Sequence, residues 1–295
     1  MLIIFCDSVI DNKVVDSDYA EEKAWAEQAG HETALISYEA LEEERMQKAL
    51  RFIKPSDETQ SALYRGWMMR PSMYKLFYEG LLSKNIKLIN EPIQYQHCHY
   101  LPDSYSLIKD MTCETVWMPV TETPDWKKVH AQLGPFGTGP VIVKDYVKSE
   151  KHNWEEACFI PNAADKEAVE SVVTRFLELR GSSLNEGLVF RRFEKLTYLT
   201  QHSQSAMPLT KEFRMFFFKN ALMATFYYWE EGHYGDTYPE TTAFEQIAKS
   251  INSNFFTMDI AQKEDGSWMV MELGDGQVAG IPTGGEMTLF RGMVG

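Results

Sequence analysis

The sequence contains no hydrophobic run long enough to span a bilayer, and no basic residue precedes its apolar start, MLIIF. A membrane helix needs about 20 apolar residues and a signal peptide needs a basic n-region, so we expect neither. Cysteine is scarce, and Cys6, Cys98, Cys113 and Cys158 lie far apart without paired spacing. Free thiols of this kind are typical of a reducing compartment, so we expect a cytoplasmic protein without disulfides.

Positive charge is also scarce, since 29 Lys and Arg residues stand against 43 Asp and Glu residues, for a net charge of −14. A general nucleic-acid binder needs a basic surface to neutralise phosphates, so this composition disfavours that class but leaves a local basic cleft open. Two glycine signatures are missing as well. No dinucleotide fingerprint follows the first apolar strand, and the glycines before Val141 lead to no Gly-Lys-Ser/Thr sequence.

The stretch 255–277, FFTMDIAQKEDGSWMVMELGDGQ, has the pattern of a β-hairpin. Asp265-Gly266 between two alternating runs predicts a two-residue type I′ turn. In the resulting register Asp259 lies opposite Glu272, and Ile260 lies opposite Met271. One face of the hairpin is predicted to carry apolar side chains into a core: Met258, Ile260, Met269, Met271 and Leu273.

The other face of this hairpin presents the carboxylates of Asp259 and Glu272, whose Cβ atoms would lie roughly 5 Å apart. Like charges at that distance repel, and a divalent cation between them would remove the repulsion. Oxygen ligands from two or three carboxylates suit magnesium, and Asp275 offers a third acid. The alternative is an exposed face whose acids point into water.

Strands alternate with helices over roughly the first 110 residues, which predicts a small parallel α/β domain at residues 1–114. We expect a single charged helix near residues 41–50 and a loop around Pro102. The later order of strands and helices predicts α+β units at 115–200 and 201–295. In the first of these, apolar residues at helical spacing between residues 164 and 180 predict a helix that packs on a sheet.

A strand after the glycine-rich segment GPFGTGP carries two candidate phosphate-binding lysines. If residues 142–148 are all extended, Lys144 and Lys148 share one face and stand about 13 Å apart. Two ammonium groups beside bulky apolar neighbours suit a nucleotide. The alternative is a solvated edge strand.

The strand expected at residues 211–218 places Glu212 and Arg214 on one face, followed by Phe216 and Phe218. Arg214 at the rim of a cleft could bind a carboxylate or a phosphate through two parallel hydrogen bonds. A surface ion pair between Glu212 and Arg214 is the alternative. The loop at residues 230–242 is a candidate cover over such a cleft.

The order of these motifs along the chain resembles that of the ATP-grasp superfamily over roughly residues 115–285. The elements that carry the likeness are Lys144 after a glycine-rich approach, a hinge strand at 188–196, the Glu212-Phe-Arg214 strand, and the late Asp259 and Glu272. The chain looks most similar to the divergent clade named for one arginine and two lysines, which includes a eukaryotic assembly protein for translation initiation factor 2. One departure is that Glu272-Leu-Gly-Asp275 stands where many members have Glu-x-Asn.

The resemblance implies an ATP-grasp fold in which two lobes with antiparallel sheets clasp ATP. It assigns ATP binding to Lys144, Lys148, Arg191, Arg192, Phe193, Glu194 and Glu212, with the hinge residues beside adenine. It assigns catalysis to Arg214 and Lys211, although Lys211 competes with Lys148 as the second signature lysine. Magnesium would bind Asp259 and Glu272, with Asp275 as a further candidate ligand.

The activity implied by the resemblance is an ADP-forming carboxylate–amine ligase that makes an amide bond through an acyl-phosphate. Its substrates would be an amino acid, a peptide or a protein terminus. The alternative is an ATP-binding assembly factor that shapes a surface for a partner protein without turnover. An enzyme acting on nucleic-acid ends is a third hypothesis, which the acidic composition disfavours.

Overall fold

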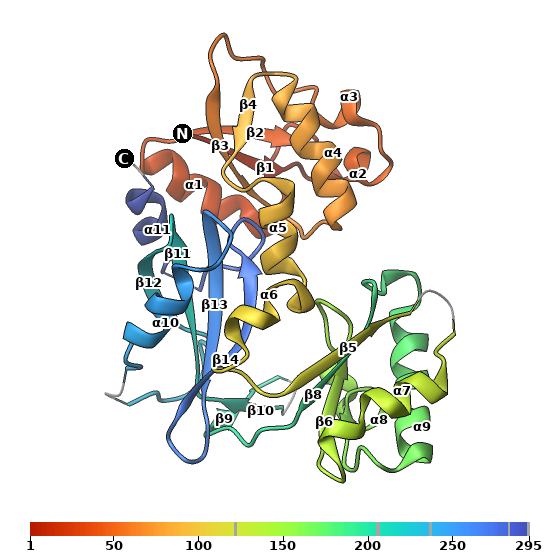
Figure 1. The fold of residues 1–295 in the computed structure, drawn as a ribbon. Helices are drawn as coiled ribbons and strands as arrows, with labels where there is room; N and C mark the ends of the chain where they lie inside the picture. Colours follow the sequence, from red (N-terminus) through yellow and green to blue (C-terminus); the bar gives the residue numbers. More distant parts are fainter. Residues whose placement is uncertain (121–122, 205–206, 236–237, 283, 294–295) are drawn as a thin grey trace.

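The computed structural model describes residues 1–120, 123–204, 207–235, 238–282 and 284–293. Within these described ranges, the strands form three four-stranded sheets and one short two-stranded ribbon (Figure 1). Each of the predicted ranges 1–114, 115–200 and 201–295 contains one of the larger sheets. The boundaries between these units stay a prediction.

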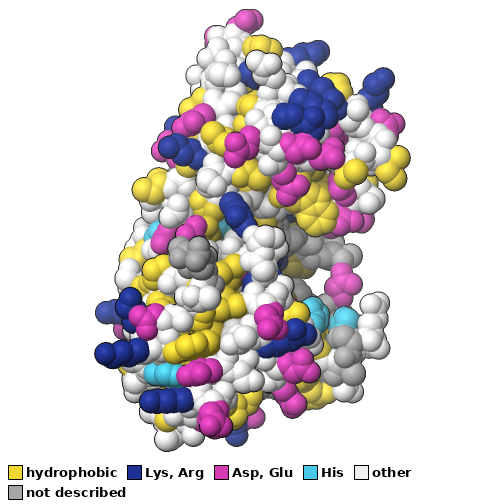
Figure 2. Space-filling view, turned by 90° about the vertical axis from the view of Figure 1, so that its right-hand side faces the viewer, with side chains coloured by type: hydrophobic (Ala, Val, Ile, Leu, Met, Phe, Trp, Pro, Cys, Tyr) yellow, Lys and Arg dark blue, Asp and Glu magenta, His cyan; other side chains and the backbone are white. Residues whose placement is uncertain are grey.

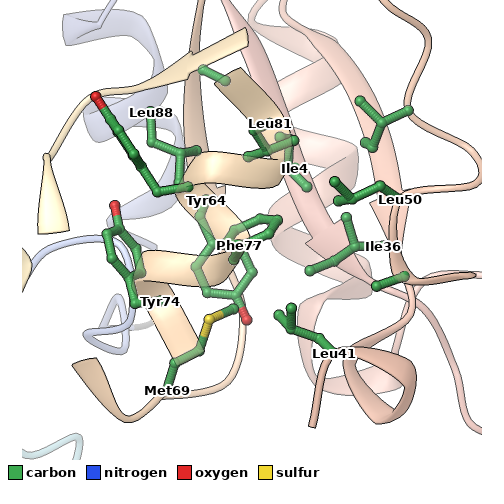
Figure 3. Close-up of a cluster of buried hydrophobic side chains, with 14 of the residues drawn as sticks. Ile4, Ile36, Leu41, Leu50, Tyr64, Met69, Tyr74, Phe77, Leu81 and Leu88 are labelled. Carbon is green, nitrogen blue, oxygen red and sulfur yellow. The ribbon is translucent and has the colours of Figure 1, made fainter. Parts of the chain in front are cut away.

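The first sheet is parallel, with strand order β2-β1-β3-β4, as the α/β pattern predicts. One core lies between this sheet and its helices and contains Tyr64, Phe77 and Leu81 (Figure 3). The single helix predicted near residues 41–50 is wrong, because Glu44 adopts a positive φ of 55° and separates two short helices. The elements are β1 (Leu2–Cys6), α1 (Ala20–Gln28), β2 (Glu32–Ile36), α2 (Tyr38–Glu42), α3 (Met46–Ala49), β3 (Gln60–Arg65), α4 (Pro71–Leu82) and β4 (Ile86–Leu88).

Two helices, α5 (Pro92–His99) and α6 (Leu101–Ile108), replace the loop expected around Pro102. Each has a proline in its first turn, where the missing N–H is not needed for a helical hydrogen bond. They lead away from the first sheet toward the third (Figure 1). Cys98, Leu101 and Ile108 there join a core with residues of the third sheet.

The second sheet is antiparallel, with strand order β5-β8-β6-β7. Its longest helix, α9, is capped by Asp165, which accepts a hydrogen bond from the backbone N–H of Ala168. The predicted apolar face of α9 is buried, including Val169, Val173 and Phe176. The elements are β5 (Thr115–Pro119), α7 (Trp126–Gln132), β6 (Val141–Lys144), α8 (Trp154–Ala157), β7 (Phe159–Ile160), α9 (Lys166–Arg180) and β8 (Gly187–Arg192).

The third sheet is antiparallel as well, with strand order β12-β11-β13-β14. The final helix returns to the first sheet, because Phe290 packs in one core with Phe5 and Leu63. Residues 236 and 237 of the candidate cover loop lie outside the described residues. The elements are β9 (Tyr198–Gln201), β10 (Pro208–Thr210), β11 (Glu212–Phe218), β12 (Ala221–Tyr227), α10 (Thr242–Ala248), β13 (Phe255–Gln262), β14 (Trp268–Asp275) and α11 (Glu286–Gly292).

The β13–β14 hairpin differs from its prediction in its loop length and in a bulge. The two resulting shifts in register offset each other at Asp259 and Glu272. The loop has three residues, because Lys263 pairs with Ser267 and Gly266 takes a φ of 84°. A β-bulge then leaves Met271 unpaired, so Ile260 pairs with Val270, and the predicted pairing of Ile260 with Met271 is wrong. Asp259 nevertheless pairs with Glu272 as predicted.

The core of the third sheet reflects this shift of register. Met258, Ile260 and Leu273 enter the predicted core, and Val270 takes the place expected for Met271. Met269 pairs with Ala261 and therefore lies on the opposite face of the hairpin.

Acidic and basic side chains are interspersed among hydrophobic ones on the face drawn in Figure 2, and no large basic area covers the described part of it. Within the described ranges, the helices all fall short of the length and apolar character that crossing a bilayer would require.

Candidate functional site

A cleft of about 220 Å³ lies where the three larger units meet. The first unit contributes Met68, His99 and Leu101, and the second contributes Lys144, the segment 146–149 and Lys151. The wall formed by the third unit includes Arg214, Tyr228, Thr257, Asp259, Glu272 and the segments 273–275 and 278–280. Both predicted lysines, the predicted arginine and the predicted carboxylate pair therefore border one space.

Three of these side chains form a row across the third sheet. Arg214 on β11 pairs with Asp259 on β13, and Asp259 pairs with Glu272 on β14. Because side chains alternate between the faces of a strand, neighbours in register project from the same face. The flanking Phe213 and Met215 point into the core instead.

Arg214 and Asp259 form a bidentate ion pair at one end of this row. Nε and Nη2 of Arg214 donate to the two carboxylate oxygens of Asp259 at 2.8 and 2.7 Å, and Nη1 donates to the Gly280 carbonyl at 2.9 Å. The guanidinium lies 4.8 Å from the centre of the Tyr228 ring. Burial raises the pKa of Asp259 and Arg214 opposes this, while the pKa of Arg214 is raised by Asp259 despite burial.

Glu272, at the other end of the row, binds a lysine from the second sheet. Nζ of Lys144 donates to Oε2 of Glu272 at 3.0 Å, and Lys144 is 5% exposed while the Glu272 side chain is 41% exposed. Burial alone would raise the pKa of Glu272, but Lys144, Arg191 and Arg214 together lower it to about 2. The charges along this wall therefore follow the order cation, anion, anion, cation.

Lys148 reaches the cleft by a different route from the one predicted. Strand β6 ends at Lys144, so the extended segment predicted over 142–148 is wrong, and Lys148 lies in a turn. Desolvation at the cleft wall lowers the pKa of Lys148, the ammonium of Lys144 lowers it further, and Glu272 opposes both. The two lysines are thus electrostatic neighbours rather than groups held apart along one strand.

Asp275 is not brought to the Asp259–Glu272 pair. It lies three residues after Glu272 on β14, which turns its side chain to the opposite face, and it is 1% exposed. Its carboxylate accepts hydrogen bonds from Nδ2 of Asn90 at 2.6 Å and from the backbone N–H of Gln277 at 2.9 Å. Burial raises its pKa to about 7, although these hydrogen bonds lower it. In this conformation Asp275 contributes to the contact between the first and third sheets.

The predicted hinge residues are not among the described residues of the cleft wall. Arg191 is buried and donates from Nη1 to the carbonyl of bulged Met271 at 2.7 Å. Arg192 forms an ion pair with Glu114, and the ring of Phe193 packs against Trp154 and Phe159. The role of Arg191, Arg192, Phe193 and Glu194 at adenine stays a prediction.

Lys211 and Glu212 also lie outside the described wall of the cleft. Glu212 accepts hydrogen bonds from Thr210 and from Nε1 of Trp229, and burial raises its pKa to about 7. The alternative of a surface pair between Glu212 and Arg214 is not what the described residues show, since Arg214 binds Asp259 instead. The assignments of Lys211 to catalysis and Glu212 to nucleotide binding stay predictions.

The cleft residues that sequence reasoning missed include Lys151, Tyr228 and His99. Nζ of Lys151 lies 5.3 Å from the centre of the Trp229 ring, so a short 3-10 helix of the second unit, Lys151–Asn153, touches the third unit. The spacing Lys144, Lys148, Lys151 was a signal that could have identified it. His99 could not be identified in this way, because it lies on a helix that the sequence did not predict.

Asp259 and Glu272 have the chemistry to hold magnesium. Magnesium is commonly bound through one or two carboxylates, with water and substrate phosphates as its other ligands. Each ionised carboxylate has about four acceptor positions, so the contacts with Arg214 and Lys144 leave some available. No cluster of three or more His, Cys, Asp or Glu side chains suited to a metal occurs within the described ranges. The donor set therefore fits an ion that relies on phosphate and water for its remaining contacts.

The fold is that of the ATP-grasp proteins. The solved ATP-grasp ligase PsnB, complexed with a minimal precursor, Mg and ADP, is 12% identical to this chain, with a TM-score of 0.55 over 99% of this chain and 97% of that one. D-cycloserine synthetase DcsG is 12% identical, with a TM-score of 0.59 over 99% and 98%. A RimK domain ATP-grasp protein from Sphaerobacter thermophilus is 14% identical, with a TM-score of 0.58 over 98% and 99%.

The family follows from the sequence itself. The profile of an ATP-grasp domain, family 3 of the clade named for one arginine and two lysines, matches residues 132–292, which is more than half of the chain. The chain therefore belongs to this family, and the predicted superfamily and fold class are confirmed. A search of curated protein sequences gives no significant match.

Proposed function

We propose that this protein is an ATP-dependent carboxylate–amine ligase that forms an amide bond and releases ADP and phosphate. The observation that carries the proposal is the charged row of Arg214, Asp259 and Glu272, which faces Lys144 in a cleft between sheets. Such a row supplies cations for phosphates and carboxylates for magnesium within one space. The similarity in fold to the ligases PsnB and DcsG supports the same class of reaction.

The proposed reaction has two steps. A carboxylate oxygen of the first substrate attacks the γ-phosphorus of ATP, and the bond between that phosphorus and the β,γ-bridging oxygen breaks. The products of this step are ADP and an acyl-phosphate. The amine of the second substrate then attacks the acyl carbon, phosphate departs, and the amine nitrogen loses a proton. In this type of transfer the protein mainly positions the groups and stabilises charge.

The residues of the cleft divide these tasks. Lys144 and Lys148 bind the phosphates of ATP, and Arg214 offsets negative charge on the transferring phosphoryl group. Asp259 and Glu272 would hold magnesium, which when bound adds positive charge at the phosphates. Closure of the cleft would keep water from hydrolysing the acyl-phosphate.

We propose an amino acid, a peptide or a protein terminus as the source of the carboxylate and the amine. PsnB, one of the similar structures, was solved with a precursor peptide, which supports a peptide substrate. The second candidate, an ATP-binding assembly factor, would use the same cleft without making an amide.

Measuring ADP release in the presence of ATP, magnesium and pooled amino acids or peptides tests the proposal. A ligase should release ADP only when a substrate carboxylate is present, and hydroxylamine added in place of the amine should trap the acyl-phosphate as a hydroxamate. ATP binding with no ADP release in any pool would favour the assembly factor instead.

A further inference from the structure

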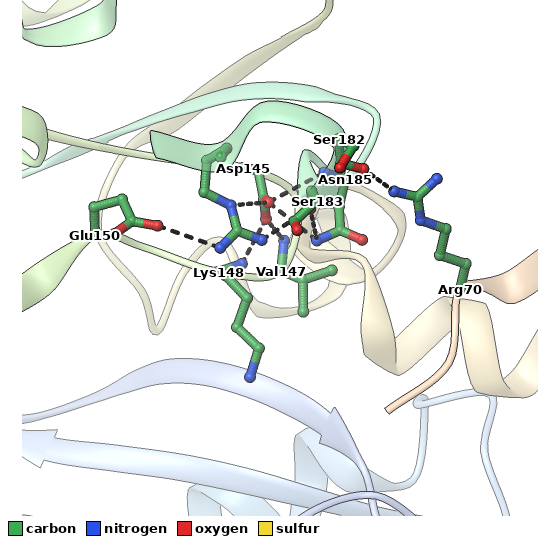
Figure 4. A network of polar contacts seen from close by, with 9 residues as sticks. Arg70, Asp145, Val147, Lys148, Glu150, Ser182, Ser183 and Asn185 are labelled. Carbon is green, nitrogen blue, oxygen red and sulfur yellow. Dashed lines mark hydrogen bonds and ion pairs between the residues drawn. The ribbon is translucent and has the colours of Figure 1, made fainter. Parts of the chain in front are cut away.

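The turn that carries Lys148 is organised by the buried carboxylate of Asp145, the residue after the end of β6 (Figure 4). Oδ1 of Asp145 accepts hydrogen bonds from the backbone N–H groups of Val147 and Lys148 at 2.7 and 2.5 Å. The backbone N–H of Asp145 in turn donates to the Lys148 carbonyl at 2.8 Å. The chain therefore reverses between Asp145 and Lys148 instead of continuing as a strand.

The second oxygen of Asp145 is fixed from the opposite side of the turn. Oδ2 accepts from Nε of Arg180 at 3.1 Å, and from the backbone N–H and side-chain Nδ2 of Asn185 at 3.1 and 3.0 Å. Arg180 is the last residue of α9 and also donates to Glu150. These contacts anchor the turn to the longest helix of the second unit.

The first unit contacts the same region. Arg70, at the start of α4, donates to the carbonyl of Ser182, two residues after Arg180 (Figure 4). Asp145 itself is 0% exposed and is not among the described residues that line the cleft. A ligand in the cleft would therefore touch the residues that Asp145 holds rather than Asp145 itself.

We propose that Asp145 is a positioning residue for nucleotide binding, because its carboxylate holds the turn that places Lys148 in the cleft beside Lys144. Two ammonium groups, rather than one, then face the phosphates. This inference rests on the proposed function, since the phosphates are those of ATP. It adds a residue that neither contacts the nucleotide nor lines the cleft.

Hydrogen exchange of the ligand-free protein tests the first part of this inference. In Asp145→Ala the amides of Val147 and Lys148 lose their acceptor, so the segment 145–149 should exchange at least ten times faster than in wild type. Asp145→Asn keeps an oxygen that can accept both amides but loses the charge opposite Arg180, so its exchange should be intermediate. Unchanged exchange in this segment in both variants would overturn the proposal.

A double-mutant cycle on ATP affinity tests the second part, measured by calorimetry with magnesium present. Asp145→Ala and Lys148→Ala should each weaken ATP binding about tenfold or more. The double variant should be no more than about twofold weaker than Lys148→Ala, because residues that act through one another are not additive. Additive losses, or wild-type affinity in Asp145→Ala, would contradict the positioning role.

Asp165→Ala provides the matched control, since it removes an aspartate that caps α9 in the same unit, away from the cleft. It should leave both ATP affinity and exchange at 145–149 unchanged. If Asp145→Ala does not fold, Asp145→Asn and Arg180→Gln replace it in the cycle. Wild-type protein that fails to bind ATP would overturn the proposed function, and the exchange data alone would still decide whether Asp145 holds the turn.

Discussion

Asp259 and Glu272 lie directly opposite each other on β13 and β14, yet their carboxylates bind different cations. Asp259 is held by Arg214 from its own sheet, whereas Glu272 is held by Lys144 from the second sheet. Two neighbouring carboxylates would repel, and this division gives each a positive partner. The contact between Lys144 and Glu272 also joins two sheets across the cleft.

Replacing Lys144 should weaken ATP binding even when the variant protein remains folded. Lys144→Met removes a cation from the cleft and leaves Glu272 without its ammonium partner. A charge-assisted hydrogen bond is worth about 1.5–3 kcal/mol, so affinity measured by calorimetry should fall about 10- to 100-fold. Lys127→Met, at an exposed lysine on α7, is the control and should bind ATP as wild type does. Equal affinities in the two variants would contradict the assignment of Lys144.

The sequence correctly predicted that Asp259 pairs with Glu272, but the hairpin geometry used for that prediction was partly wrong. The Asp265-Gly266 signal correctly located the hairpin, but the loop has one residue more than predicted, and bulged Met271 restores the register at Asp259 and Glu272. Whether a β-bulge forms depends on the contacts that the bulged strand makes with other elements. Here the Met271 carbonyl accepts a hydrogen bond from Arg191 on a distant strand, which the sequence does not reveal.

The lysines and the third acid illustrate a second limit. Lys144 and Lys148 both border the cleft, as periodicity suggested, but Lys148 does so through the Asp145 turn. Asp275 follows Glu272 closely in sequence, yet its partners, Asn90 and Gln277, bury it between two sheets. Local sequence pattern predicted many of the strands and helices and most of the charged row. The positions of individual side chains, such as those of Lys148 and Asp275, depend on contacts with residues distant in the chain, which the local pattern does not show.

Breaking the Arg214–Asp259 pair should destabilise the fold in a way that a second substitution relieves. Arg214→Met leaves the carboxylate of Asp259 buried without a counter-ion, which should cost about 3–5 kcal/mol of unfolding free energy in chemical denaturation. In Arg214→Met/Asp259→Leu no uncompensated charge remains, so stability should largely return.

The double variant also separates stability from chemistry. Its ADP release should remain lost, because it lacks both Arg214, the cation proposed for the transferring phosphoryl group, and Asp259, one of the two proposed magnesium ligands. A double variant as unstable as Arg214→Met would show that the charge of Asp259 is not the cause of the destabilisation.

Asp275 should make stability depend on pH between about 4 and 7. Its pKa is raised to about 7 in the folded protein from an ordinary value of 3.8, so between these values the folded state holds a proton that the unfolded state has lost. Stability at this site therefore falls as pH rises through that interval, by up to about 4 kcal/mol, and is constant above it.

Asp275→Asn removes this ionisation and should become progressively more stable relative to wild type as pH rises from 4 to 7. Denaturation of both proteins across that range measures the difference. A difference that stays the same at every pH would mean that Asp275 does not ionise in this interval.

The central claim is that Glu272 helps to bind ATP together with magnesium, and calorimetric titration of ATP tests it most directly. Wild-type protein should bind ATP more tightly with magnesium than without it, and Glu272→Ala should lose most of that magnesium dependence. Glu264→Ala, at an exposed acid in the loop of the same hairpin, should behave as wild type. Magnesium-dependent binding that survives unchanged in Glu272→Ala, or no ATP binding by wild type, would contradict the account.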